Sequence, residues 1–147
     1  MAHALNQKIS KYMTQPVITA SPEDGARQAF FKMREHRVRH LPVVDAEDQL
    51  VGIISDRDLR RPDWVDETPN IAHVYRLDDA LRVGDLMTPE PVTVRTHDRV
   101  SKAVKTLQKH RFGALPVINK EGKLVGVLSS VDLLDVLGEI VNASEQK

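Results

Sequence analysis

The stretch Gly52–Asp58 (GIISDRD) decides the fold, because it returns as Gly126–Asp132 (GVLSSVD). In both places a glycine and two aliphatic residues lead into a serine, and an aspartate follows that serine three residues later. The two stretches start 74 residues apart, 126 minus 52. Similarity at one fixed offset is the signature of an internal repeat. The sequence therefore predicts two copies of one small structural unit.

The same offset extends outward from this stretch. Leu41–Val44 (LPVV) returns as Leu115–Ile118 (LPVI), and the pair Met13-Thr14 returns as Met87-Thr88. We therefore divide the chain into a first repeat (8–60), an inserted linker (61–82) and a second repeat (83–141).

The linker contains the chain's single tryptophan, Trp64, and one of its two tyrosines, Tyr75. Aromatic side chains usually anchor a segment through the area that they bury. An insert of this length inside a compact domain can also carry function. Both interpretations of the linker stay open at this stage.

Within each copy, apolar residues at helical spacing and apolar runs typical of strands occur in the same order. Apolar residues at helical spacing predict one helix over 26–33 and its repeat over 100–107, with Ser21 as the N-cap of the first. A further helix is expected after Ser55 and Ser129, short in the first copy and longer in the second. The order β-α-β-β-α, twice, predicts an α/β (α+β) fold. The predicted strands are 17–19, 41–44 and 50–55 in the first copy, and 92–94, 115–118 and 124–129 in the second.

Composition excludes several classes of function. Lysine plus arginine equals aspartate plus glutamate, 21 against 21, so no basic field favours nucleic acid or an anionic membrane. The 147 residues include no cysteine, which removes disulfides and thiolate chemistry. The longest apolar stretches are too short to cross a bilayer. We expect a cytoplasmic protein that binds neither nucleic acid nor membrane.

The Ser-x-x-Asp ends of the two quoted stretches could bind a nucleotide. A serine that caps a helix leaves backbone N–H groups free near the positive end of the helix dipole, which favours a phosphate. An ionised aspartate can accept both hydroxyls of a ribose. The alternative is a capping box, in which serine and aspartate stabilise the helix without any ligand.

A cluster of hydrogen-bond donors precedes the second strand of the first copy. It comprises Arg37, Arg39 and His40, which could grip phosphate oxygens. The second copy keeps Arg111 but has Gly113 and Ala114 in place of Arg39 and His40. We therefore expect the first copy to be the better phosphate site. The alternative is that Arg39 and His40 are merely solvated residues at a strand end.

Signals for catalysis are weak. The six histidines show no metal-binding spacing, and neither Ser55 nor Ser129 has an evident general base. We expect no enzyme activity, no metal site and no required cofactor.

These ordered motifs, present twice, resemble the CBS domain, named for cystathionine β-synthase, and specifically the tandem pair called a Bateman module. The resemblance implies a pseudo-twofold disc of two repeats packed through their sheets. It also implies two clefts that bind AMP, ADP, ATP, S-adenosylmethionine or NAD-type ligands, with AMP expected first. The implied role is regulatory, with a ligand-driven conformational change passed to a partner protein.

The resemblance also implies a set of nucleotide-binding residues. Asp58 and Asp132 match the ribose acceptors, and Ser55 and Ser129 match the phosphate-side hydroxyls. The full expected set is Ile18, Thr19, Arg39, His40, Ile53, Ser55, Arg57 and Asp58 in the first copy, and Thr93, Val94, Val127, Ser129 and Asp132 in the second.

Such modules usually form homodimers through their helices. The last predicted helix supports this expectation, because its apolar residues form more apolar surface than one terminal helix needs. Two alternatives to a sensor remain: a dimerisation scaffold with vestigial pockets, and a small nucleotide hydrolase. The apolar residues are Leu133, Leu134, Leu137, Ile140 and Val141.

Overall fold

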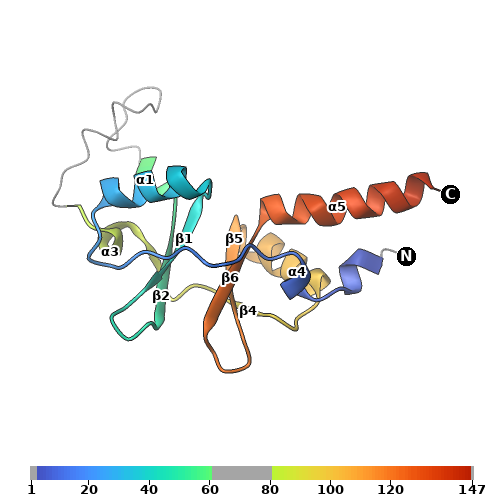
Figure 1. Ribbon diagram of the computed structural model, residues 1–147, viewed down its shortest axis with the longest axis horizontal. Helices are drawn as coiled ribbons and strands as arrows, with labels where there is room; N and C mark the ends of the chain where they lie inside the picture. Colours follow the sequence, from blue (N-terminus) through green and yellow to red (C-terminus); the bar gives the residue numbers. More distant parts are fainter. Residues whose placement is uncertain (1–2, 61–80, 147) are drawn as a thin grey trace. The chain divides into compact units, whose positions relative to one another are not determined.

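The computed structural model describes residues 3–60 and 81–146, and these form two compact units (Figure 1). Unit 1 combines Met1–Val17 with Val92–Lys147, and unit 2 is the continuous segment Ile18–Pro91. The predicted linker, with Trp64 and Tyr75, lies outside the described residues except at its end.

Unit 2 contains one three-stranded antiparallel sheet with helices before and after it. Its strands occur in the order β1-β2-β3, and β1 and β2 form a hairpin in which His40 lies opposite Ser55. The elements are α1 (Ala26–His36), β1 (His40–Val44), β2 (Leu50–Ser55), the 3-10 turn η3 (Asp58–Arg60), α3 (Val83–Leu86) and β3 (Thr88–Pro89).

Unit 1 is built on the same plan. Its sheet has the order β4-β5-β6, in which β4 runs parallel to β5, and β5 and β6 form the hairpin. The elements are the 3-10 turns η1 (His3–Asn6) and η2 (Ile9–Lys11), followed by β4 (Val94–Arg95), α4 (Val100–His110), β5 (Ala114–Ile118), β6 (Leu124–Ser129) and α5 (Ser130–Glu145).

The predicted α/β (α+β) class is confirmed, and so are both hairpins and the helices α1 and α4. The first strand of each copy differs from the prediction. Residues 17–19 form no strand, and a single parallel bridge joins Ala20 to Val43. In the second copy the pairing begins only at Val94, opposite Val117. In the first copy the paired residue, Ala20, comes just after the predicted strand, and in the second copy pairing starts at the last predicted residue, Val94.

The predicted serine cap of α1 is wrong. The backbone N–H of Ser21 instead donates to Oδ2 of Asp24 (2.9 Å), which closes a separate turn. The helix begins one turn later, at Ala26, and its N-cap residue is Gly25. The prediction failed because a serine followed by acids suits a tight turn as well as a helix start.

Each sheet is completed by a segment from the other sequence repeat. Thr14, from the first repeat, pairs with Val127 of β6, and its N–H donates to the Val127 carbonyl (2.8 Å). Thr88, from the second repeat, pairs with Ile53 of β2 at the equivalent position. The two Met-Thr pairs, Met13-Thr14 and Met87-Thr88, are therefore exchanged between the repeats, and we call them the exchanged segments.

Each unit has its own hydrophobic core. In unit 2 the inner faces of α1 and the β1–β2 hairpin bury Met33, Leu41 and Ile54. In unit 1 the corresponding residues of α4 and the β5–β6 hairpin are joined by Ile9 and Tyr12 from the N-terminal segment. Completely burying one such aliphatic side chain contributes about 1.5–3 kcal/mol.

The N-terminal segment is also held to unit 1 by polar contacts. The hydroxyl of Tyr12 donates a 2.6 Å hydrogen bond to Glu139 on α5. Burial and this contact with a carboxylate raise the pKa of Tyr12 to about 12. Lys11 reaches the same carboxylate at 4.0 Å.

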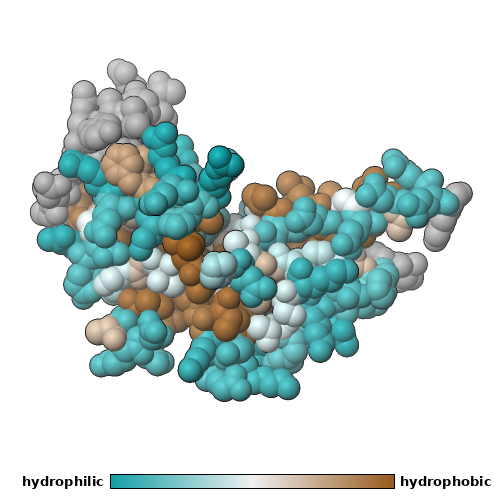
Figure 2. All heavy atoms as spheres, viewed as in Figure 1, coloured by the Kyte–Doolittle hydropathy of each residue, from teal (hydrophilic) through white to brown (hydrophobic). Residues whose placement is uncertain are grey.

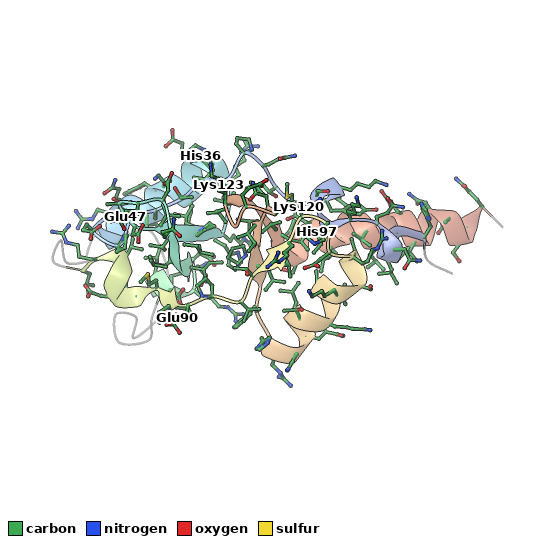
Figure 3. The ribbon with its side chains drawn as sticks, turned by 90° about the horizontal axis from the view of Figure 1, so that it is seen from below. His36, Glu47, Glu90, His97, Lys120 and Lys123 are labelled. Carbon is green, nitrogen blue, oxygen red and sulfur yellow. The ribbon has the colours of Figure 1, made fainter. Side chains whose placement is uncertain are left out.

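The two hairpin turns have the same pattern of hydrogen bonds; Figure 3 labels Glu47 in the first turn and Lys120 and Lys123 at the second. Oδ1 of Asp45 accepts from the N–H groups of Glu47 and Gln49, and Oδ1 of Asn119 accepts likewise from Glu121 and Lys123. Such side-chain acceptors fix a turn without help from the sheet.

Candidate nucleotide site

The β1–β2 hairpin brings both halves of the predicted first-copy site to one end of the sheet. His40 opens β1 and lies opposite Ser55, the last residue of β2. Just beyond this pair, the N–H of Asp56 donates to the carbonyl of Arg39 (2.9 Å). Arg39, His40, Ser55 and Asp58, which we call the first-copy site, therefore meet through backbone pairing alone.

Asp58 caps the turn that follows β2. Its Oδ2 accepts from the N–H of Ser55 (2.8 Å), while Oγ of Ser55 accepts from the N–H of Asp58 (3.2 Å). This is the capping box that the sequence offered as the alternative to a ligand site. Among the described residues, no hydrogen bond to the other oxygen, Oδ1, is present. The cap thus leaves much of the acceptor capacity of the carboxylate unused.

His40 is half-buried, and burial lowers the pKa of its imidazole. The carboxylates of Asp56 and Asp58 act in the opposite direction and favour the charged ring, while Arg39 reinforces the effect of burial. Burial is the largest of these effects, so the balance favours the neutral ring. An anionic ligand would tip this balance toward the imidazolium form.

Lys32 is a cation that sequence reasoning missed and that contacts one of the expected site residues. It projects from α1, and its Nζ donates a 2.7 Å hydrogen bond to the carbonyl of Thr19, one of the expected site residues. A signal was available: the position 74 residues further on is Thr106, so this cation exists in one copy only. Lys32, Arg39 and His40 are thus replaced by uncharged residues in the second copy.

The remaining first-copy residues differ in exposure. Ile18, Thr19 and Ile53 are partly buried, as residues that line a pocket would be, whereas Arg57 is exposed. The assignment of these four residues to the site stays a prediction.

The second copy repeats the cap with one addition. Oδ2 of Asp132 accepts from the N–H (2.8 Å) and the hydroxyl (3.2 Å) of Ser129, at the start of α5. The hydroxyl of Thr14 donates to Oδ1 of the same carboxylate at 3.0 Å and lies 3.3 Å from Oδ2. Gly113 and Ala114 supply no cation here. Asp132 is thus engaged by an exchanged segment, and Asp58 is not.

Other residues predicted to bind the nucleotide in the second copy are less accessible to a ligand. Val94 is 2% exposed and belongs to the core of unit 1, so its side chain faces away from solvent. Thr93 and Val127 are partly buried. Val94 lies 74 residues after the buried Ala20. Ala20 pairs with Val43 and Val94 pairs with Val117, so the two positions are equivalent and both are buried.

An apolar stripe is exposed along α5. Its members are Val131, Leu134, Leu137 and Val141, and Leu134 is 62% exposed. Figure 2 shows apolar residues along this helix. Of the residues expected on this surface, Leu133 and Ile140 instead pack partly against the core of unit 1.

The described residues include no group of histidine, cysteine or acidic side chains placed to hold a metal ion. Over the same ranges, no helix is both long and apolar enough to traverse a membrane.

Two copies of one α/β unit, each ending its hairpin in a Ser-x-x-Asp cap, define a tandem-repeat domain pair. The sequence model of the CBS domain matches residues 9–62 and 83–139. The chain belongs to the CBS domain family and carries two copies of the domain.

Solved structures share this architecture. The CBS-pair protein CBSX2 of Arabidopsis thaliana is 29% identical, with a TM-score of 0.76 over 93% of this chain and 98% of that one. The structure of CBSX2 in complex with AMP is 30% identical, with a TM-score of 0.72 over 90% and 97%. A CBS domain-containing protein of Dictyostelium discoideum is 30% identical over 90% of this chain and 92% of its own length.

Proposed function

We propose that this protein is a regulatory module that binds adenosine-containing nucleotides, with AMP as the first candidate and ADP or ATP as further ligands. The first-copy site binds the phosphate and the ribose. Binding changes the conformation or rigidity of the module, and a partner protein detects the change.

One observation carries this proposal: a single hairpin end joins donors suited to phosphate with an acceptor suited to ribose. Arg39 is exposed and His40 is partly so, which leaves both able to reach a ligand. Asp58 lies just beyond the strand opposite them, with Oδ1 available. Cations suit the phosphate of a nucleoside monophosphate, and a carboxylate suits its ribose.

The comparison with CBSX2 supports the choice of ligand. That protein has been solved with AMP, and its similarity covers 90% of this chain. Phosphate should bind more tightly in the first copy, because the second lacks the cations Lys32, Arg39 and His40.

Signalling requires that the ligand prefer one arrangement of the module over another. The exposed stripe of α5 is suited to a homodimer, and a dimer would let two modules respond together. We also propose a cytoplasmic setting, where adenine nucleotides are abundant.

The test is calorimetric titration of the purified chain with AMP, ADP, ATP, S-adenosylmethionine and NAD. We expect Asp58→Asn to weaken AMP binding at the tighter site by more than about tenfold, because hydrogen bonds to a charged acceptor contribute about 1.5–3 kcal/mol each. The amide oxygen of asparagine can keep the cap to Ser55. Asp132→Asn is the matched control and should leave the tighter site unchanged.

A dimerisation scaffold with vestigial pockets is the second candidate. Two observations favour it: both aspartates already serve as helix or turn caps, and α5 exposes an apolar stripe. A scaffold predicts no heat of binding with any of the five ligands, which would exclude the sensor.

A further inference from the structure

Helix α5 is attached to unit 1 along a narrow inner face. Of its 16 residues, all of them described, Val136 alone is buried. Leu133 and Ile140 pack partly against the same core. A single helix of this length is only marginally stable in water without such packing. The position of α5 therefore depends on what its inner face meets.

This inner face meets the N-terminal segment of the chain. α5 contacts the turn η1 (His3–Asn6), and Figure 1 shows the N-terminal turns running beside the helix. Ala4 and Ile9 belong to the same buried cluster as Val136, and Leu5 packs against that cluster. We call residues 3–12 the strap. The strap is thus part of the surface on which α5 rests.

The strap has an attachment of its own at the start of α4. The N–H of Ile9 donates to the carbonyl of Asp98, and the N–H of Val100 donates to the carbonyl of Gln7, both at 2.9 Å. The side chain of Ile9 is completely buried. These contacts do not involve α5, so the strap is a support against which the helix is placed.

One polar contact ties the strap to the second half of α5. The hydroxyl of Tyr12 donates to Oε2 of Glu139 (2.6 Å), and Nζ of Lys11 lies 4.0 Å from Oε1 of the same carboxylate. Tyr12 is 9% exposed, and a buried phenol requires a hydrogen-bond partner. Its raised pKa keeps the hydroxyl protonated, as a donor must be. Glu139 lies between Leu137 and Val141, two members of the exposed stripe.

Unit 2 offers an internal comparison. The residue 74 positions after Tyr12 is Leu86, which is buried in the core of unit 2. The segment that precedes it is attached in the same way, because the N–H of Ala26 donates to the carbonyl of Leu81 (3.0 Å). Leucine has no hydroxyl, and in the described part of unit 2 the strand β2 leads into the three-residue turn η3. The hydroxyl thus occurs in the unit whose hairpin leads directly into a long helix.

We propose that the strap is a conformational device that presents the homodimer surface. Through Tyr12 and Glu139 it holds the second half of α5, with Leu137 and Val141, in the position that a second copy binds. Tyr12 is a positioning residue in this device. When the strap lifts, this half of the helix loses its inner support and the stripe loses its fixed geometry. The inference rests on the homodimer of the proposed function and adds a means of controlling it.

The first test is amide hydrogen exchange in Tyr12→Phe, which keeps the ring in the core and removes the hydroxyl. Exchange over residues 137–145 should become about threefold to tenfold faster, the worth of one hydrogen bond, while β5 and β6 stay unchanged. Thr106→Val is the matched control. It removes a hydroxyl that donates to the carbonyl of Lys102 (2.8 Å) on α4 of the same unit, and it should leave the exchange of α5 unchanged.

A second variant shows whether Tyr12 acts through Glu139. In a Glu139→Ala background the partner of the hydroxyl is already absent, so adding Tyr12→Phe should accelerate exchange over 137–145 by less than about twofold. A full effect in that background, or faster exchange in β5 and β6 as well, would mean a general loss of stability and would overturn the inference.

The last measurement is the dissociation constant of the dimer, by analytical ultracentrifugation. Tyr12→Phe should raise it by about threefold to tenfold, and Thr106→Val should not change it. The affinity for AMP at the first-copy site, which lies in unit 2, should stay within about twofold. An unchanged dimer constant in Tyr12→Phe overturns the inference alone. A wild-type chain that is monomeric at every concentration overturns the homodimer of the proposed function, and the inference with it.

Discussion

His40 is the residue whose charge state depends most on its surroundings in the first-copy site. Burial lowers the pKa of the ring against the pull of Asp56 and Asp58. The residue therefore links folding to pH even without a ligand.

We predict that His40 makes the protein less stable in mild acid. The folded-state pKa lies below the ordinary value of 6.5, so the unfolded chain takes up the proton first. The contribution of the neutral ring is complete above about pH 6.5 and is lost as the pH falls through the folded-state pKa. Urea unfolding at pH 7.5 and pH 5.5 should show a smaller difference in His40→Gln than in the wild type. An equal difference in both proteins would contradict this prediction.

At this scale the sequence placed Arg39, His40, Ser55 and Asp58 in one site, and hairpin pairing brings them to one end of the sheet. Their role in binding stays a prediction. Lys32 was missed because its contact is with the carbonyl of Thr19, and a backbone acceptor leaves no trace in residue types. The contact between Thr14 and Asp132 was missed for a related reason: it depends on tertiary pairing across most of the chain.

At the scale of elements, the exchanged segments explain the glycines that open the two quoted stretches. A Cβ placed on Gly126 would lie 2.9 Å from both Sδ of Met13 and the carbonyl oxygen of Thr14. A Cβ on Gly52 would meet Met87 and lie 3.0 Å from the carbonyl oxygen of Thr88. Each glycine therefore permits the close approach of an exchanged segment to a central strand.

We predict that Gly126→Ala destabilises the protein by about 1–3 kcal/mol, the usual cost of overpacking a tight contact. The backbone oxygen of Thr14 cannot swing aside as a side chain can. Gly138→Ala is the control, because a Cβ there meets nothing within 4 Å. Since Gly138 lies inside α5, alanine should stabilise it by up to about 1 kcal/mol. Equal effects of the two substitutions on urea unfolding would argue against the explanation.

The sequence predicted the helices and strands better than it predicted which segment pairs with which strand. Hairpins and helices followed from periodicity and from short connections, which are local properties. The exchange was not predicted, because the motif Met-Thr has the same residues whichever sheet it joins. The offset of 74 residues located equivalent positions but carried no information about which copy of a strand each segment pairs with.

At the scale of the whole molecule, the main feature is the exposed apolar stripe on α5, which another surface could bury. Val131, Leu134, Leu137 and Val141 are spaced along one helix, and each is exposed. Apolar patches of this kind on a soluble protein mark interaction surfaces.

We predict that the protein is a homodimer at micromolar concentration and that Leu134→Glu with Leu137→Glu makes it monomeric. Burying a carboxylate in an apolar contact carries a large desolvation cost. Asp135→Asn, an exposed change on the same helix, should leave the dimer intact. Light scattering after size-exclusion chromatography gives the mass directly. A wild-type protein that is monomeric throughout would remove the homodimer from the proposed function.

The division of the chain into units has a consequence for how it is made. Unit 2 is one continuous segment, so a nascent chain leaving the ribosome holds all of it once residue 91 has emerged. The N-terminal segment emerges earlier still, yet Ile9 and Tyr12 are buried against residues that follow position 92. Domains fold as they are completed. Ile9 and Tyr12 are thus synthesised before unit 2, yet they can be buried only after it, once the residues beyond position 92 have emerged.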